Sequence, residues 1–211
     1  MKLIHLSDPH IEPEILHNID TQKRFYQALE HIKQNHSDAD LFVISGDITH
    51  FGSNEAYKIF QNILNEAKLP KNLLTKIIIG NHDLRENFKN NFPDIKTDKN
   101  GFIQYSETFN DKTFIFLDTN QFNTDSGYLC KDRQEWLISE LEKKIKNKIY
   151  IFMHHNPLSL ADDRSDKIGL IQKDDFKKIL SKYKDIIKHI FFGHQHITTS
   201  GQYLGITFSS P

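Results

Sequence analysis

Residues 80–83 bring together, in a single turn, side chains that could do chemistry. A glycine is followed by Asn81, His82 and Asp83, directly after the run 76–79, whose three isoleucines are typical of a buried strand. The Asn81 oxygen could ligate a metal ion, the His82 imidazole could transfer a proton, and the Asp83 carboxylate could fix the tautomer of that imidazole. These side chains could instead serve only to close an elaborate turn, although one Asn or Asp is enough to close a turn. The other strand ends decide between the two.

Four further apolar runs end in histidine or carboxylate side chains. These residues are Asp8 and His10 after the run 3–6, Asp47 after 41–45, His154 after 148–153, and His194 and His196 after 186–192. Each of them alone could be a turn former or a satisfied core residue. Together they indicate a functional site, because the carboxyl ends of parallel strands meet at one edge of a sheet.

The types and the number of these side chains predict two transition-metal ions. Imidazoles mixed with carboxylates suit Mn, Fe or Zn better than Ca or Mg, which prefer oxygen ligands. One zinc-like ion takes only about three or four protein ligands. Two ions roughly 3.5–4 Å apart can share a carboxylate and a hydroxide, and this arrangement drives in-line attack on phosphorus. The seven candidate ligands are Asp8, His10, Asp47, Asn81, His154, His194 and His196.

The segments that must position these residues alternate between strands and helices at the start of the chain. Strands are predicted at 3–6, 41–45 and 76–79, with one helix beginning near Asp20, a good N-cap, and another at 54–67. This alternation predicts a parallel sheet with crossover helices. The later elements are expected to be a hairpin of 102–108 and 112–118, a helix at 132–145, a strand at 148–153, a polar loop at 158–171, a helix at 173–183, a strand at 186–192, and a pair of runs at 198–203 and 204–208.

Composition and charge exclude several classes of protein. The 211 residues are enough for one domain with a substantial core, and no linker marks a second one. With 27 Lys+Arg against 28 Asp+Glu, no global basic field would attract a nucleic acid polymer or an anionic membrane. The single cysteine, Cys130, excludes an internal disulfide and fits a reducing compartment. Because no stretch approaches the roughly 18 apolar residues of a membrane span, a cytoplasmic protein is predicted.

The complete series of motifs resembles the calcineurin-like metallophosphoesterase superfamily nearly from end to end. The series consists of Asp8-Pro9-His10, Gly46-Asp47, residues 80–83, His154-His155 and Gly193-His194-Gln195-His196. The resemblance implies an α/β fold, an αββα sandwich of two mixed sheets flanked by helices. It also implies two ligand sets that share a bridging Asp47: Asp8, His10, Asp47 and His196 for one metal, and Asp47, Asn81, His154 and His194 for the other. His82 would stabilise the phosphoryl oxygens or protonate the leaving alkoxide, with Asp83 orienting it.

Within the superfamily, the chain is most similar to the bacterial-type cyclic nucleotide phosphodiesterases. The residues that carry this likeness are Arg85 after 81–83, the run 153–155 followed by Pro157, and Gly52 and Tyr57 after 46–49. Asn156 departs from that branch, which commonly has proline there, and relatives usually continue beyond Pro211 with strands that often build a dimer interface or cap. Residues 1–211 are expected to form a single metallophosphoesterase domain. The resemblance leaves open whether a C-terminal extension is missing and whether the protein is a homodimer.

The predicted reaction is hydrolysis of a small nucleotide-like phosphodiester, with 3′,5′-cyclic AMP as a candidate, by in-line attack of a metal-bridging hydroxide. Asn81 and His155 are candidate substrate contacts, and Arg85 is a candidate phosphate clamp. A structural role for His155 and an ordinary surface position for Arg85 are the alternatives. The rival functions are a pyrophosphatase of nucleotide-linked precursors, a DNA nuclease and a catalytically dead scaffold. His17 and His50 have no assigned role.

Overall fold

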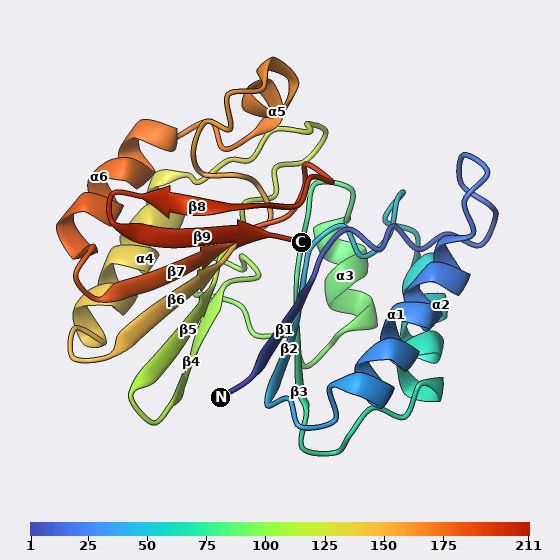
Figure 1. Ribbon diagram of the computed structural model, residues 1–211. Coiled ribbons are helices and arrows are strands. Elements are labelled where there is room, and N and C mark those ends of the chain that lie inside the picture. The colour runs from blue at the N-terminus through green and yellow to red at the C-terminus, as the bar shows by residue number, and fades with distance from the viewer.

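The computed structural model describes residues 1–211 and contains two β-sheets that face each other, with helices on both outer sides (Figure 1). The strands of the smaller sheet are β1 (Leu3–Leu6), β2 (Leu41–Ser45) and β3 (Leu74–Ile78). The strands of the larger sheet are β4 (Tyr105–Phe109), β5 (Lys112–Phe116), β6 (Lys148–Phe152), β7 (Ile187–Phe191), β8 (Thr199–Tyr203) and β9 (Ile206–Ser210). The helices are α1 (Thr21–Asn35), α2 (Asn54–Glu66), α3 (Arg85–Asn91), α4 (Lys131–Lys143), α5 (Asp163–Ile168) and α6 (Lys173–Tyr183). The predicted αββα sandwich is confirmed.

The strand order places the motif-bearing loops next to one another. β1, β2 and β3 are adjacent and parallel, as the alternation of strands and helices predicts. The larger sheet has the order β4-β5-β6-β7-β9-β8, with only the edge strands β4 and β8 antiparallel to their neighbours. Backbone hydrogen bonds join the loops directly: the Asp8 N–H donates to the Gly46 carbonyl over 3.2 Å, and the Gly193 N–H donates to the His154 carbonyl over 2.9 Å.

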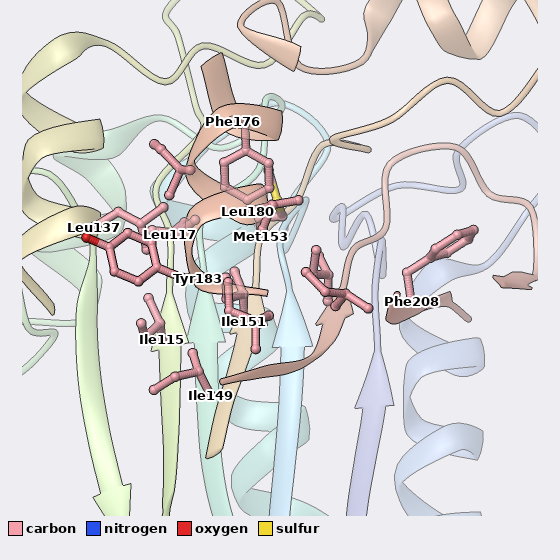
Figure 2. Close-up of a cluster of buried hydrophobic side chains, with 14 of the residues drawn as sticks. Ile115, Leu117, Leu137, Ile149, Ile151, Met153, Phe176, Leu180, Tyr183 and Phe208 are labelled. Atoms are coloured by element: carbon pink, nitrogen blue, oxygen red, sulfur yellow. The ribbon is translucent and has the colours of Figure 1, made fainter. Parts of the chain in front are cut away.

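Each sheet has its own hydrophobic core against its helices. Phe25, Leu29 and Ile32 of α1 are buried toward the smaller sheet, which confirms the predicted apolar face, and the Asp20 side chain caps the helix by accepting from the Lys23 N–H. Figure 2 shows the cluster that α4 and α6 bury against the larger sheet. Its labelled residues are Ile115, Leu117, Leu137, Ile149, Ile151, Met153, Phe176, Leu180, Tyr183 and Phe208. None of the helices has the length and apolar composition needed to span a lipid bilayer.

A stack of aromatic rings between the two sheets holds the strand ends in place. The Phe152 ring lies 4.4 Å from the Phe191 ring and 5.3 Å from the Phe116 ring, at interplanar angles of 8° and 15°. Offset-stacked rings add about 0.5–1.5 kcal/mol to the burial of their surface. Because Phe152 and Phe191 end β6 and β7, this stack fixes the positions from which the His154 and His194 loops start.

Candidate metal centre

An unusual backbone brings most of the predicted metal ligands together. The φ angles of five of them, Asp8, His10, Asp47, His194 and His196, are 58°, 45°, 48°, 72° and 52°. Residues other than glycine seldom adopt this left-handed conformation, which costs free energy that surrounding contacts must offset. Gly80 also lies so close to Asp47 that a Cβ atom at residue 80 would collide with the carboxylate. Such strain concentrated in five loop residues is typical of a functional site.

Asp8, His10 and His196 form the first group of candidate ligands. Nε2 of His196 lies 3.4 Å from Oδ1 of Asp8 and 3.1 Å from Nε2 of His10. The ligand atoms of the three residues all lie within 4.8 Å of one another. Oδ1 of Asp8 is buried and has no hydrogen-bond partner. A buried carboxylate oxygen without a partner is costly unless a cation satisfies it, so this group fits a metal ion.

Asp47 lies between the first group and a second one. Its Oδ2 atom is 3.6 Å from Nε2 of His10 and 3.3 Å from Nε2 of His154. Nε2 of His154 is in turn 3.0 Å from Oδ1 of Asn81. A single carboxylate oxygen therefore faces ligand atoms of both groups. The donor set fits two metal ions that share Asp47.

In two of the histidines, a hydrogen bond at one ring nitrogen determines that the other nitrogen is the one that can bind a metal. Nδ1 of His154 donates to the Ser45 carbonyl over 2.8 Å, so Nε2, on the side of Asp47, is its available ligand atom. Nε2 of His194 donates to the Ile168 carbonyl over 3.0 Å, so Nδ1 is its available ligand atom. Metal-binding histidines usually have such a partner on the second nitrogen, because it orients the ring. The seven side chains predicted as ligands thus lie near one another, with the His194 ring centroid 5.1 Å from that of His154.

Burial and the carboxylates of Asp47 and Asp8 shift the pKa values of three histidines of this centre in opposite directions. Burial lowers the pKa of His10 and of His194 to about 4, so both rings are neutral at neutral pH. Burial also disfavours charge on His154, but the carboxylates of Asp47 and Asp8 outweigh it and raise the pKa of His154 to about 9. In the metal-free protein, His154 therefore keeps its proton at neutral pH.

We expect metal binding to release a proton from His154, because Nε2 cannot be both protonated and a ligand. Its pKa in the folded protein is raised, so a proton competes with the metal below about pH 9 and affinity increases with pH by up to about tenfold per unit. Mn²⁺ titration calorimetry near neutral pH, in buffers of different ionisation enthalpy, counts the released protons. His154→Asn is the matched control and should release about one proton fewer. An unchanged count in this variant would contradict the assignment.

The His82 ring lines the cleft beside the ligands and is oriented by a backbone carbonyl. Its Nδ1 donates to the carbonyl oxygen of His50 over 2.8 Å, which leaves Nε2 available toward the cleft. The backbone N–H of His82 donates to Oδ1 of Asp47 over 2.9 Å. His82 is therefore fixed to the metal centre through its main chain, while its ring faces the space that a substrate would occupy.

The prediction that Asp83 orients the His82 ring is wrong. The buried Asp83 carboxylate accepts hydrogen bonds from the backbone N–H groups of Ile48, Thr49 and Gly80, at 3.1, 3.1 and 2.9 Å. These amides lie in two tight loops, and a buried N–H without a partner is costly, so the carboxylate turns inward to satisfy them. Asp83 thus joins the loop of Asp47 to the loop of Asn81, and the His82 ring is hydrogen-bonded to the His50 carbonyl instead.

The prediction that Arg85 binds the substrate phosphate is also wrong. Its guanidinium donates two hydrogen bonds of 2.9 Å to the Asp118 carboxylate and one of 3.0 Å to the Asn120 carbonyl. Asp118 is fully buried and also forms an ion pair with Arg133 at 3.3 Å. A buried carboxylate must be paired to offset its desolvation. Asp118 therefore holds Arg85 away from the cleft.

His155 lies behind the metal ligands, so the predicted substrate contact is wrong and the structural alternative is supported. The ring is fully buried and does not line the cleft. Its Nδ1 is 2.7 Å from the Thr119 hydroxyl oxygen, and its ring centroid is 4.9 Å from that of His154 and 4.6 Å from that of His194. Burial lowers the pKa of His155 well below its ordinary value. The neutral ring packs against the two ligand rings from inside.

A cleft of about 870 Å³ is lined by six of the seven candidate metal ligands and by four basic side chains to which the sequence assigned no role. These are His17 and His50, in the loops after β1 and β2, Arg24 of α1 and Arg164 of α5. His50 follows Asp47 by three residues, so its place in a motif loop is a signal that could have found it. No pattern in the sequence marks Arg24 and Arg164, because the cleft between α1 and α5 exists only in the folded chain.

Paired metal-ligand groups at the strand ends of an αββα sandwich are typical of two-metal hydrolases. The family model of calcineurin-like phosphoesterases matches residues 1–198, and the chain belongs to this family. The protein is a metal-dependent phosphoesterase, as the motif series predicts.

Proteins of named activity are similar to the chain over nearly its whole length. A probable cyclic nucleotide phosphodiesterase of Rhodopseudomonas palustris is 29% identical over 213 residues, which cover 99% of this chain and 76% of the relative. A probable glycerophosphodiester phosphodiesterase of Arcobacter nitrofigilis is 29% identical over 220 residues, covering 100% of this chain and 78% of the relative. The crystal structure of a dimetal phosphatase from Danio rerio superposes with a TM-score of 0.78 at 12% identity, covering 99% of this chain and 86% of that structure. This last likeness supports the fold.

Proposed function

We propose that the protein hydrolyses a small nucleotide-like phosphodiester, with 3′,5′-cyclic AMP as the first candidate. The observation that carries the proposal is the position of Asp47 between the His10 and His154 imidazoles, in a cleft into which His82 points. Bacterial relatives named as cyclic nucleotide and glycerophosphodiester phosphodiesterases support a diester as substrate. The proposal treats residues 1–211 as a single catalytic domain.

In this proposal, Asp8, His10, Asp47 and His196 hold one divalent metal ion, and Asp47, Asn81, His154 and His194 hold the other. Bound ions of Mn, Fe or Zn supply Lewis-acid activation of the ester and of the attacking water. Hydrogen bonds to the Ser45 and Ile168 carbonyls orient the His154 and His194 rings for this role.

The side chains that act on the substrate are Asn81 and His82. Asn81 directs Oδ1 toward the centre, so its amide N–H₂ is the group that can donate to a phosphoryl oxygen. His82 carries one proton on Nδ1, held by the His50 carbonyl, and can hold a second on Nε2. From Nε2 it either donates a hydrogen bond to a phosphoryl oxygen or transfers the proton to the leaving alkoxide.

The arginines favour one second candidate, a pyrophosphatase of nucleotide-linked precursors. Of the four arginines in the chain, Arg85 and Arg133 pair with Asp118. Arg24 and Arg164 instead line the cleft and form no ion pair in the protein. Two free guanidinium groups suit a substrate with a second phosphate, because arginine binds phosphate through paired hydrogen bonds.

The test compares three substrates with the manganese-reconstituted protein: 3′,5′-cyclic AMP, bis(p-nitrophenyl) phosphate and a nucleoside diphosphate sugar. Cleavage of both diesters is the expected result. Preferential cleavage of the nucleoside diphosphate sugar would favour the pyrophosphatase instead. A loss of that preference in Arg24→Gln and Arg164→Gln would show that the two arginines cause it. Cleavage of none of the three, with both metals bound, would overturn the proposal. Asp47→Asn protein prepared in the same way gives the background rate.

A further inference from the structure

His50 stands between a metal ligand and the proposed proton carrier. Its ring centroid is 5.2 Å from that of His10 and 4.5 Å from that of His82. The rings of His50 and His82 are nearly parallel, with an interplanar angle of 22°. The backbone N–H groups of His50 and Phe51 both donate to Oε1 of the buried Glu12, at 3.0 and 2.9 Å. Because the His50 carbonyl also accepts from Nδ1 of His82, the main chain at this position is fixed on two sides.

The hydrogen bond between His10 and His50 settles the tautomer of both rings once a metal is bound. Nε2 of His10 faces Asp8, Asp47 and His196, so it must give its lone pair to the metal and its proton must be on Nδ1. This Nδ1 is 3.2 Å from Nδ1 of His50, so His10 donates and His50 accepts. A neutral imidazole that accepts at Nδ1 carries its proton on Nε2. His50 therefore has an Nε2–H group.

The Nε2–H group of His50 is free to bind a ligand. His50 lines the cleft, and the protein provides no hydrogen-bond partner for this nitrogen. His82 has the opposite arrangement, because its proton is on Nδ1 and its Nε2 has a lone pair when the ring is neutral. The stacked rings therefore present different groups to the same cleft: a fixed donor on His50 and a nitrogen that can gain a proton on His82.

We propose that Nε2–H of His50 donates a hydrogen bond to a phosphoryl oxygen of the substrate, and that its Nδ1 holds the His10 ring in its metal-binding tautomer. The inference rests on the proposed two-metal site, because the proton position follows from metal binding at His10. It does not depend on which ester is the substrate, because the hydrogen bond is made to the phosphoryl group that every ester of this class contains.

Two substitutions separate the two roles of His50. The side-chain oxygen of His50→Asn can occupy the position of Nδ1 and accept from His10, but this variant lacks the donor in the cleft. The amide nitrogen of His50→Gln can reach the position of Nε2 and keep the donor, but it leaves Nδ1–H of His10 without its acceptor. His31→Asn is the matched control, because His31 lies exposed on α1 and bonds only to Asn35.

The measurements are Mn²⁺ affinity by calorimetry, binding of inorganic phosphate to the metal-loaded protein, and turnover of bis(p-nitrophenyl) phosphate. We expect His50→Asn to bind Mn²⁺ like the wild type but to bind phosphate and turn over about tenfold to a hundredfold less well. We expect His50→Gln to keep more of the phosphate affinity but to bind Mn²⁺ more weakly. Wild-type phosphate affinity in His50→Asn would overturn the proposal. A wild-type protein that binds phosphate but cleaves no ester would instead contradict the proposed function alone.

The tautomer itself can be measured without any reaction. In ¹⁵N-labelled protein loaded with Zn²⁺, which is diamagnetic, long-range ¹⁵N–¹H correlation distinguishes a protonated from an unprotonated ring nitrogen. The His50 signals are those lost in His50→Asn. We expect them to show protonation on Nε2 only. Protonation on Nδ1 would overturn the proposal, because Nε2 would then have no hydrogen to donate.

Discussion

The Asp47→Asn variant is expected to lose both metal ions while it keeps its fold. Oδ2 of Asp47 faces ligands of both groups, at 3.6 Å from Nε2 of His10 and 3.3 Å from Nε2 of His154, and lies closer to both than Oδ1 of Asp8 does. Asparagine has the same shape and can still accept from the His82 N–H through its oxygen, so the loop remains supported. Its amide nitrogen, however, would occupy the bridging position and cannot ligate a cation. Affinity for each ion should fall by more than about a hundredfold.

The measurement is the number of Mn²⁺ ions that remain bound after gel filtration, with circular dichroism to verify the fold. Asp8→Asn is the matched control, because Oδ1 of Asp8 lies 3.4 Å from Nε2 of His196 in the first group but 3.9 Å from Nε2 of His154 in the second. This variant is expected to weaken the binding of one ion more than that of the other. If Asp47→Asn lost one ion and held the second with wild-type affinity, Asp47 would not be the bridging ligand.

The elements that were predicted correctly have strong local signals. β2 and α6 have the predicted bounds, because an uninterrupted apolar run and a clear helical period each end at polar residues. Two short helices were not predicted. α3 has 7 residues and α5 has 6, which is too short to show a period, and α5 lies in the polar stretch that was expected to be a loop. Its formation depends on tertiary contacts, including the burial of Ser165 and the hydrogen bond from His194 to the Ile168 carbonyl.

In the candidate site, likewise, the positions of some residues could be predicted from the sequence and the contacts of others could not. The order of strands and motifs correctly indicated that the candidate ligands lie close together, because parallel topology brings the ends of β1, β2 and β3 to one edge. The partners of neighbouring side chains could not be predicted in this way. Asp83 and Arg85 follow the ligand Asn81 closely, but Asp83 turns to the Ile48 and Thr49 amides, and Arg85 turns to Asp118, 33 residues away. Such choices depend on which buried groups need a partner in the folded protein.

The His82→Ala variant should bind both metals normally and lose turnover by about a hundredfold or more. Metal binding should survive because the His82 ring is held by the His50 carbonyl and is not a ligand, and because alanine keeps the backbone N–H that donates to Asp47. Steady-state kinetics together with the bound Mn²⁺ content measure both parts of this expectation. His82→Gln is the control variant, because its amide can still donate a hydrogen bond but cannot transfer a proton.

Comparing leaving groups tells apart the two roles that remain open for His82. p-Nitrophenolate leaves without protonation, whereas the ribose alkoxide released from 3′,5′-cyclic AMP needs a proton. If His82 protonates the leaving group, His82→Ala should slow the cyclic nucleotide far more than bis(p-nitrophenyl) phosphate, and His82→Gln should not restore the rate. If His82 instead stabilises charge on the phosphoryl oxygens, both substrates should slow by a similar factor and glutamine should restore part of the rate. Wild-type turnover of both substrates by His82→Ala would remove this ring from the mechanism.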